Sequence, residues 1–487
     1  MRVALAVGAL VACAACGSTV QSTSTAAIGG GLGPDSAAVS ATGAAAGVSA
    51  PGAGPAAAGT TGSSAAHSVS TTLTGGAAPV ATSPVAAGST MPGVTATTVT
   101  VGVLAADPST DKTLENAGLA AAEVGNEPAA WQAVADDLDA HGGIAGRKVK
   151  LVFYLVNLTD PPAAQGAAAC ARFTEDTTVA VVISGYYYSS ADTCLSRKGV
   201  PALLGTNYGV DRVQQRQSST VIAWATPLLD RLAALLPPAF QRMGRLKAGT
   251  TAGIFVTDAP AFTRAAAALR SDLTGRGVKV VVQTVKDSDS GDYGAAASDG
   301  SSAVLKFRTA GVTEVMFLSH NAFEPTVFMQ AANSQSYHPT YLLSSEQYPA
   351  QLAGLVPAGQ LDGALALGWA PTVDLASGYA TSPRARQCLA TLARHGVKPS
   401  TGAQTIVGLL ACDGVDLLRR AAQASGGLTS RAVLSANAVS SSLGFVSAFT
   451  LRTAFDGGRH DGVAAYRPMA FDSSCTCFHY TGAGTTW

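Results

Sequence analysis

The chain contains few residue patterns of the kind that carry out catalysis. Ser109-Thr110-Asp111-Lys112 fits the S-x-x-K pattern of serine acyl-enzymes, but no lysine is followed by Thr-Gly or Ser-Gly to complete that set. The sequence has no G-x-S-x-G elbow, no H-E-x-x-H motif and no G-x-x-x-x-G-K-[ST] phosphate loop. Its histidines are isolated from one another, so we expect His320 and His460 to be surface or loop residues. We predict a protein that is not an enzyme and needs no cofactor.

Two of the eight cysteines lie at the N-terminus, where they indicate export. Met1-Arg2 is followed by an apolar run, residues 3–12, and then by Cys13 and Cys16. The run is shorter than the roughly 20 residues that span a bilayer, but it suits the apolar core of an export signal. The small residues before a cysteine look like a bacterial lipobox. We therefore expect acylation of Cys16, with Cys13 as the alternative, and a protein anchored by lipid to the outer face of the bacterial cell membrane.

The other six cysteines indicate disulfides, because an exported protein meets no reducing glutathione pool and their number is even. Neighbours in the sequence suggest the pairs Cys170–Cys194, Cys388–Cys412 and Cys475–Cys477. A partial metal site from Cys475, Cys477 and His479 is the alternative. The remaining cysteines are scattered, so no metal site is predicted.

The composition of residues 17–96 predicts a tether. Between Gly17 and Ala106 the only charged residue is Asp35, and Phe, Tyr and Trp are absent. Such a segment buries too little apolar surface to offset the cost of ordering its backbone, about 1–2 kcal/mol per residue. The whole chain has 31 basic and 31 acidic residues, so it offers no basic patch for nucleic acid.

From about Thr97 onward, apolar runs alternate with amphipathic stretches, which predicts parallel sheets covered by helices. A first series combines strands at 99–104, 149–156, 179–184 and 201–204 with helices at 129–140, 163–175 and 191–198. A second series combines strands at 251–256, 278–284, 315–319 and 340–343 with helices at 228–241, 262–276, 293–309 and 325–334. After 363–367, helices are expected at 383–395, 401–424 and 430–438, followed by an extended tail from Leu443. Two such series in a chain of 487 residues predict two doubly wound lobes.

One helix and the strand after it identify a family. Trp131, Val134, Ala135 and Leu138 recur at the spacing of one buried helix face, and His141-Gly142-Gly143 should end that helix before the strand around Leu151. The phrase Asp-Leu-Asp-Ala-His-Gly-Gly-Ile-Ala-Gly-Arg-Lys-Val resembles the helix-turn-strand signature of the leucine/isoleucine/valine type of periplasmic solute-binding protein, the binding component of many ABC importers.

This resemblance implies an α/β fold of type I, in which the chain crosses between two lobes three times. After the lipoprotein signal at residues 1–16 and the tether at 17–96, the resemblance places lobe one at 97–225 with 371–440, and lobe two at 226–370 with 441–487. The implied function is capture of a small polar solute, an amino acid or a related compound, between the lobes and delivery to an ABC transporter permease. A monomer is expected. The alternatives are a ligand-sensing receptor of the same fold and, more remotely, an exported hydrolase.

Ligands of open parallel sheets bind beyond the carboxyl ends of the strands. The loops expected there mix hydroxyl groups, aromatic rings and few charges, which suits a small polar or zwitterionic solute. The candidate ligand-binding residues are Tyr186, Tyr187, Tyr188, Ser189, Ser190, Thr206, Asn207, Asp258, Phe262, Asn321 and Glu346.

Roles for some of these residues are implied by the resemblance alone. In amino-acid-binding relatives a hydroxyl group and backbone amides of lobe one meet the solute carboxylate, so Ser189 or Ser190 would take that role, and Glu346 would meet the ammonium group. The first loop departs from the glycine-rich and hydroxyl-rich pattern of many amino-acid binders, because Asp107-Pro108 and Asp111-Lys112 occupy it. Phe262-Thr263 replaces the usual Tyr-Gly after Asp258. A solute other than a branched-chain amino acid is therefore compatible with the sequence.

Overall fold

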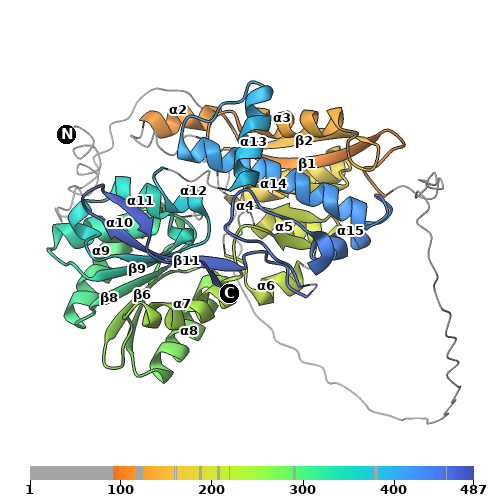
Figure 1. The fold of residues 1–487 in the computed structure, drawn as a ribbon. Coiled ribbons are helices and arrows are strands. Elements are labelled where there is room, and N and C mark those ends of the chain that lie inside the picture. Colours follow the sequence, from red (N-terminus) through yellow and green to blue (C-terminus); the bar gives the residue numbers. More distant parts are fainter. Residues whose placement is uncertain are drawn as a thin grey trace, which may run out of the picture. The chain divides into compact units, whose positions relative to one another are not determined.

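A computed structural model describes residues 91–116, 124–157, 160, 162–185, 189–205, 209–218, 220–288, 292–377, 382–456 and 458–487, which belong to one compact unit (Figure 1). The predicted export signal with Cys13 and Cys16, and the predicted tether, lie outside the described residues. The described part contains two sheets, each with its own covering helices. We call these lobe one and lobe two.

The sheet of lobe one is parallel throughout, with strand order β2-β1-β3-β4-β5. Its strands are β1 (Thr98–Ala106), β2 (Lys148–Val156), β3 (Val181–Ser184), β4 (Ala202–Leu204) and β5 (Val221–Ala223). The helices between them are α2 (Ser109–Asn116), α3 (Glu127–Ala140), α4 (Pro162–Ala171), which continues into a π-helical turn at Arg172–Asp176, α5 (Ser189–Arg197) and α6 (Arg212–Gln217). The predicted strands and helices of this series are present with ends that differ by one or two residues, apart from the helix predicted at 163–175, which divides at Ala171.

The sheet of lobe two has the order β12-β11-β10-β9-β8-β6-β7. The strands β6 (Thr251–Thr257), β7 (Lys279–Val285), β8 (Glu314–Leu318), β9 (Thr340–Ser344) and β10 (Leu365–Gly368) are parallel, whereas β11 (Ala465–Asp472) and β12 (Cys477–Tyr480) are antiparallel, and a short β13 (Thr485–Thr486) pairs with β11. The helices are α7 (Leu229–Arg242), α8 (Pro260–Gly275), α9 (Tyr293–Thr309), α10 (Phe323–Ser334), α11 (Pro349–Leu355) and α12 (Pro371–Asp374).

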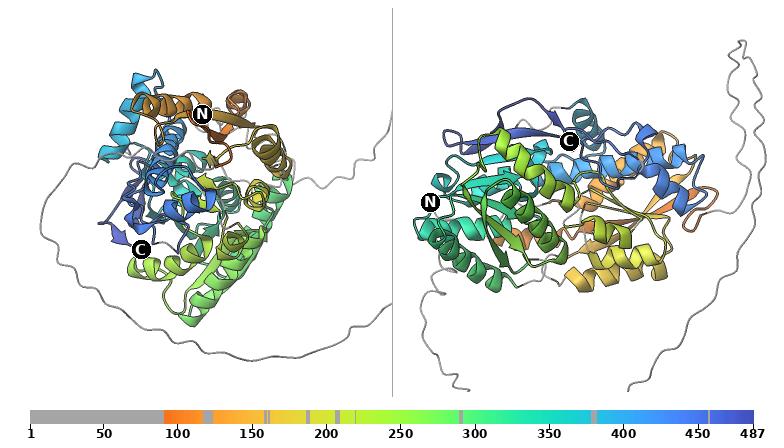
Figure 2. Two further views of the ribbon diagram at one scale, coloured as in Figure 1. Left: turned by 90° about the vertical axis from the view of Figure 1, so that its right-hand side faces the viewer. Right: turned by 90° about the horizontal axis from the view of Figure 1, so that it is seen from below.

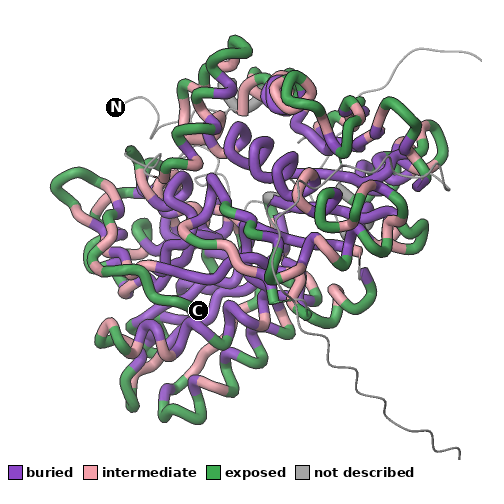
Figure 3. Tube along the Cα trace, turned by 45° about the vertical axis from the view of Figure 1, so that its right-hand side comes forward, coloured by how far each residue is buried: buried purple, intermediate pink, exposed green. Residues whose placement is uncertain are grey.

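After α12 the chain returns to lobe one and adds three helices, α13 (Pro383–Arg394), α14 (Gly402–Ala424) and α15 (Arg431–Ala438). Helix α14 packs on α3 and on strands β3 and β4, so segments far apart in the sequence lie side by side (Figures 1 and 2). Gly414 makes this approach possible, because a Cβ atom there would come within 2.5 Å of Ile183 Cγ2. Both faces of each sheet are therefore covered, and the strands form the buried centre of each lobe (Figure 3).

Three disulfides are present, at the predicted pairs. Cys170–Cys194 joins α4 to α5 and Cys388–Cys412 joins α13 to α14, each with a sequence separation of 24 residues. In the chain-entropy model a loop of this length contributes about 3–4 kcal/mol to stability. Cys475–Cys477 closes the turn between β11 and β12. In the described part of the chain, no helix is both long enough and apolar enough to cross a membrane.

Candidate functional site

Acidic side chains and one histidine gather where the parallel strands of lobe two end. Because β6 to β10 are parallel, their carboxyl ends meet at one edge of the sheet, where ligands of such sheets bind. The residues that follow these strands at this edge are Asp258 after β6, Asp287 after β7, His320 and Glu324 after β8, Glu346 after β9 and Asp374 after β10.

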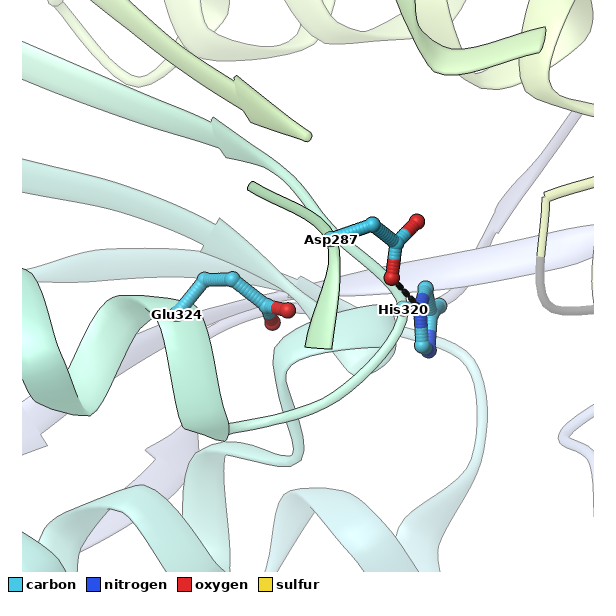
Figure 4. Close-up of side chains that lie close together, drawn as sticks. All are labelled: Asp287, His320 and Glu324. Atoms are coloured by element: carbon cyan, nitrogen blue, oxygen red, sulfur yellow. Dashed lines mark hydrogen bonds and ion pairs between the residues drawn. The ribbon is translucent and has the colours of Figure 1, made fainter. Parts of the chain in front are cut away.

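Asp287, His320 and Glu324 form a buried cluster at this edge (Figure 4). One ligand atom from each lies within 4.8 Å of the others, and His320 Nε2 is 3.1 Å from Asp287 Oδ1. The N–H group of Ser288 donates a hydrogen bond to Glu324 Oε1 at 3.1 Å, whereas Glu324 Oε2 is buried and has no hydrogen-bond partner among the described residues. Burial raises the pKa of Glu324, and the nearby His320 opposes this rise. The sequence predicted a surface or loop position for His320: it lies in the loop after β8, but it is not a surface residue, because only 3% of it is exposed.

Glu346 lies in a 3-10 turn, Ser345–Gln347, that begins directly after β9. Its carboxyl group is buried, and Oε1 has no hydrogen-bond partner within the part of the chain that the structure describes. Burial raises the pKa of Glu346 to about 8, and His320 opposes this rise. A buried carboxyl group of this kind is held neutral near pH 7 unless a positive charge comes beside it. The structure thus places Glu346 at the strand edge that the sequence indicated. Its predicted contact with a solute ammonium group stays a prediction.

Asp374 ties the strand ends of β9 and β10 together. It accepts hydrogen bonds from the Ser345 hydroxyl at 2.7 Å, from the Tyr480 hydroxyl at 2.7 Å and from the Ala370 N–H group at 3.0 Å. Burial raises its pKa to about 7, and these hydrogen bonds oppose the rise. Asp374 is therefore a positioning residue for the turn that carries Glu346.

Two further predicted ligand residues of lobe two have partners within the protein. Asp258 accepts hydrogen bonds from Lys286 Nζ and from the Asp287 N–H group, both at 3.0 Å. Asn321 lies beside His320, with 3.2 Å between Asn321 Nδ2 and His320 Nδ1, and its Oδ1 accepts from the Phe323 N–H group. Both residues thus support the loops that carry Asp287 and His320.

In lobe one the described part of the strand edge is centred on Glu127, at the start of α3. Its carboxylate accepts hydrogen bonds from the N–H group of Ala106 at 2.7 Å and from Trp131 Nε1 at 3.0 Å. Burial raises its pKa to about 7, while these two bonds lower it. Glu127 thereby fixes the end of β1 against α3.

The other predicted residues of lobe one lie largely outside the described part of the chain. Tyr186, Tyr187 and Tyr188, like Thr206 and Asn207, are outside the described residues. Ser189 and Ser190 form the first turn of α5. The contribution of these loops to ligand binding stays a prediction.

The strand ends of the two lobes meet at Phe262. This side chain is buried, its ring centroid lies 5.7 Å from that of His320, and a Cβ atom on Gly209 of lobe one would come within 2.5 Å of the ring. Beside it, Arg264 Nε of lobe two donates a hydrogen bond to Asp211 Oδ2 of lobe one at 2.6 Å. The loop after β4 is therefore in contact with the N-terminal part of α8, the helix that follows β6.

Buried carboxylates also fix the segments that cross between the lobes. Asp461 accepts hydrogen bonds from Arg231 and from the N–H group of Leu228, next to the crossing from β5 to α7. Asp413 of α14 accepts from the N–H groups of Ala448 at 2.7 Å and Phe449 at 3.1 Å, and from the hydroxyl group of Ser447. Burial raises the pKa of Asp413 to about 7. The crossing before β11 is thus anchored on lobe one.

Sequence reasoning missed Asp287, Glu324 and Asp374 as site residues. The signal that could have found Asp287 was its place two residues after the end of β7, a strand that was correctly expected. Glu324 lies in the first turn of α10, where an acidic residue is common for reasons of helix electrostatics alone. Only the parallel order of β7 and β8 around β6 brings these residues together.

Comparison with known proteins gives one family. A family model described as periplasmic binding protein matches residues 98–475. None of the curated proteins matches the sequence.

Three solved structures illustrate the similarity in fold. A branched chain amino acid ABC transporter from Thermus thermophilus with bound valine is 15% identical, with a TM-score of 0.56, and the match covers 80% of this chain and 97% of that one. A solute binding protein of an ABC transporter from R. palustris in complex with 4-hydroxybenzoate is 16% identical, with a TM-score of 0.58 and the same coverage. A leucine binding protein from Thermotoga maritima is 15% identical, with a TM-score of 0.55, and again covers 80% and 97%.

Proposed function

Because the chain belongs to the periplasmic binding protein family, we propose that it captures a small polar solute between its two lobes and delivers it to an ABC importer at the cell surface. The observation that carries this proposal is the contact of strand ends from both lobes, at Gly209 with Phe262 and at Asp211 with Arg264. A solute that touches both sets of loops stabilises the closed form, since a ligand shifts an equilibrium only by its preference for one state.

The charge of the strand edge supports a solute that carries an amine. Four carboxyl groups follow the strands at the described edge of lobe two: those of Asp258, Asp287, Glu324 and Glu346. Lys286, the lysine that the structure describes at this edge, donates a hydrogen bond to Asp258. An ammonium group beside Glu346 would let that buried carboxyl group ionise with a partner. We therefore favour an amino acid or another amine over an aromatic acid such as the one bound by the R. palustris protein.

The test begins with a thermal-shift screen of amino acids, amines, amides and aromatic acids, followed by calorimetry on the best ligand. For an amine ligand we expect Glu346→Gln to weaken binding by about 10- to 150-fold, because loss of a charged hydrogen bond in a desolvated site costs about 1.5–3 kcal/mol. Tyr187→Ala and Ser189→Ala should weaken binding from the side of lobe one. Glu175→Gln, on the exposed surface of lobe one, is the matched control. Unchanged affinity in all three site variants would place the ligand elsewhere.

We also propose that Cys16 carries a lipid anchor, with Cys13 as the alternative acylation site, and that residues 17–96 connect this anchor to the lobes. The support is the sequence itself: an apolar run, small residues and then a cysteine. Mass spectrometry of protein extracted from membranes is expected to find a diacylglyceryl cysteine at the N-terminus. The Cys13→Ala, Cys16→Ala double variant should leave the membrane fraction, and its retention there would contradict the proposal.

A further inference from the structure

The cluster of Asp287, His320 and Glu324 has the residue types and the spacing of a metal site. Two carboxylates and one imidazole come from three different segments: the end of β7, the loop after β8 and the first turn of α10. All three residues are buried, and Figure 4 shows the Glu324 carboxylate directed toward the other two side chains. Such a group differs from an acidic surface patch, because each carboxylate has been removed from water.

The distances suit a small transition-metal ion. Zn²⁺ binds nitrogen and oxygen ligands at about 2.0–2.2 Å, so ligand atoms in a tetrahedral site lie about 3.3 Å apart. His320 Nε2 and Asp287 Oδ1 are already 3.1 Å apart, and the third ligand atom lies within 4.8 Å of both. Binding of the metal would therefore require the Glu324 carboxylate to approach the other two ligand atoms by at most about 1.5 Å.

A second observation, the hydrogen bonding of the Glu324 carboxylate, supports a bound cation at this cluster. Some polar atoms of the cluster have partners within the protein: the Ser288 N–H group donates a hydrogen bond to Glu324 Oε1, and Asp287 Oδ1 lies 3.1 Å from His320 Nε2. Glu324 Oε2 is buried and has no partner among the described residues. An unpaired buried carboxylate oxygen is costly, and a cation is the partner that suits it best.

We propose that Asp287, His320 and Glu324 bind one divalent transition-metal ion, and we take Zn²⁺ as the probe because its structural and catalytic sites use these ligand types. Imidazole selects zinc and its neighbours over calcium and magnesium, which prefer oxygen ligands alone. Three protein ligands leave a fourth position open, as in zinc sites that also bind an external group. This site does not depend on delivery of a solute to an importer.

The test uses the full-length mature protein without an affinity tag, stripped with a chelator, and calorimetric titration with ZnCl₂, MnCl₂ and CaCl₂. We expect one Zn²⁺ per chain, weaker binding of Mn²⁺ and no binding of Ca²⁺. Glu324→Gln and His320→Ala should each weaken Zn²⁺ binding at least about 10-fold, since loss of even an outer partner of a ligand has effects of that size. His141→Ala removes an exposed histidine and should leave the affinity unchanged.

Folding is checked separately from binding, by circular dichroism and melting temperature in the presence of chelator. Glu324→Gln keeps the shape of the side chain, so it distinguishes a lost ligand from a lost fold. Absence of stoichiometric Zn²⁺ binding in the wild type overturns the proposal, and so does wild-type affinity in a folded Glu324→Gln variant. The solute screen is run on the chelator-treated protein, so a failure there and a failure of the metal site remain distinct.

Discussion

Replacement of Asp413 by alanine is expected to lower the free energy of unfolding by about 3–5 kcal/mol. Of its three buried hydrogen-bond donors, two lose their acceptor at about 1–3 kcal/mol each, and the third, the Phe449 N–H group, keeps only the Ser447 hydroxyl oxygen at 3.0 Å. These donors are the hydroxyl group of Ser447 and the N–H groups of Ala448 and Phe449. Chemical denaturation monitored by tryptophan fluorescence measures the change.

The matched control for this variant is Asp272→Ala, which removes a partly exposed carboxylate that pairs with Arg276 along α8. Surface ion pairs contribute little, so the control should change stability by no more than about 1 kcal/mol. Asp413 also anchors the segment that crosses between the lobes before β11. We therefore expect proteases to cleave the Asp413→Ala variant near residue 447 faster than they cleave the wild type. A loss below 1 kcal/mol, with no new cleavage, would show that water or a neighbouring group replaces the carboxylate.

The stability of the protein is expected to fall by several kcal/mol between pH 5 and pH 8. Burial raises the pKa values of Glu127, Asp374 and Asp413 to about 7 in the folded protein, whereas the unfolded chain has values near 4. The folded state therefore binds protons more strongly. The resulting stabilisation is fully present below pH 4 and is lost as the pH rises through about 7. Thermal unfolding at constant ionic strength measures this trend.

Other carboxylates determine how stability falls at low pH. The pKa values of Asp211 and Asp416 are lowered in the fold, where arginines oppose the effect of burial, and the stabilisation from these residues is lost as the pH falls below about 4. We thus expect maximum stability near pH 4–5. Glu127→Gln removes one of the raised groups and should flatten the decline toward pH 8. A melting temperature that rises from pH 5 to pH 8 would contradict the expectation.

Local patterns in the sequence predicted most of the elements, because each long helix and strand has its own hydrophobic period. The helix around Trp131 and the strand around Leu151 are examples. Strand β5 was missed, whereas β4, which is equally short, was predicted from the apolar run that Pro201 and Gly205 bound. Its assignment depends on pairing with β4, a contact that no local pattern contains.

The buried polar residues were harder to predict than the helices and strands, because the sequence around each of them has no distinctive pattern. Asp413 lies three residues before Asp416 on α14, a spacing typical of the solvent-exposed face of a helix. Both residues are nevertheless buried, because segments from elsewhere in the chain cover them. His320 was expected at the surface or in a loop because the histidines are isolated in the sequence, and the fold buries it in its loop beside Phe262 and Asp287. Burial of polar groups is decided by tertiary packing, which a single sequence expresses only weakly.

The position of α14 has a consequence for biogenesis. This helix fills the face of lobe one on which Trp131, Ile183 and Trp224 lie, and all three are close to Gly414. In the export that we propose, the N-terminal end of the chain crosses the membrane first, so strands β1 to β5 arrive long before the helix that covers them. In lobe two, by contrast, strands β6 to β10 follow one another along the sequence with no segment of lobe one between them. Lobe one must therefore keep an apolar sheet face open during secretion until the last quarter of the chain has crossed, and only then can Cys412 meet Cys388.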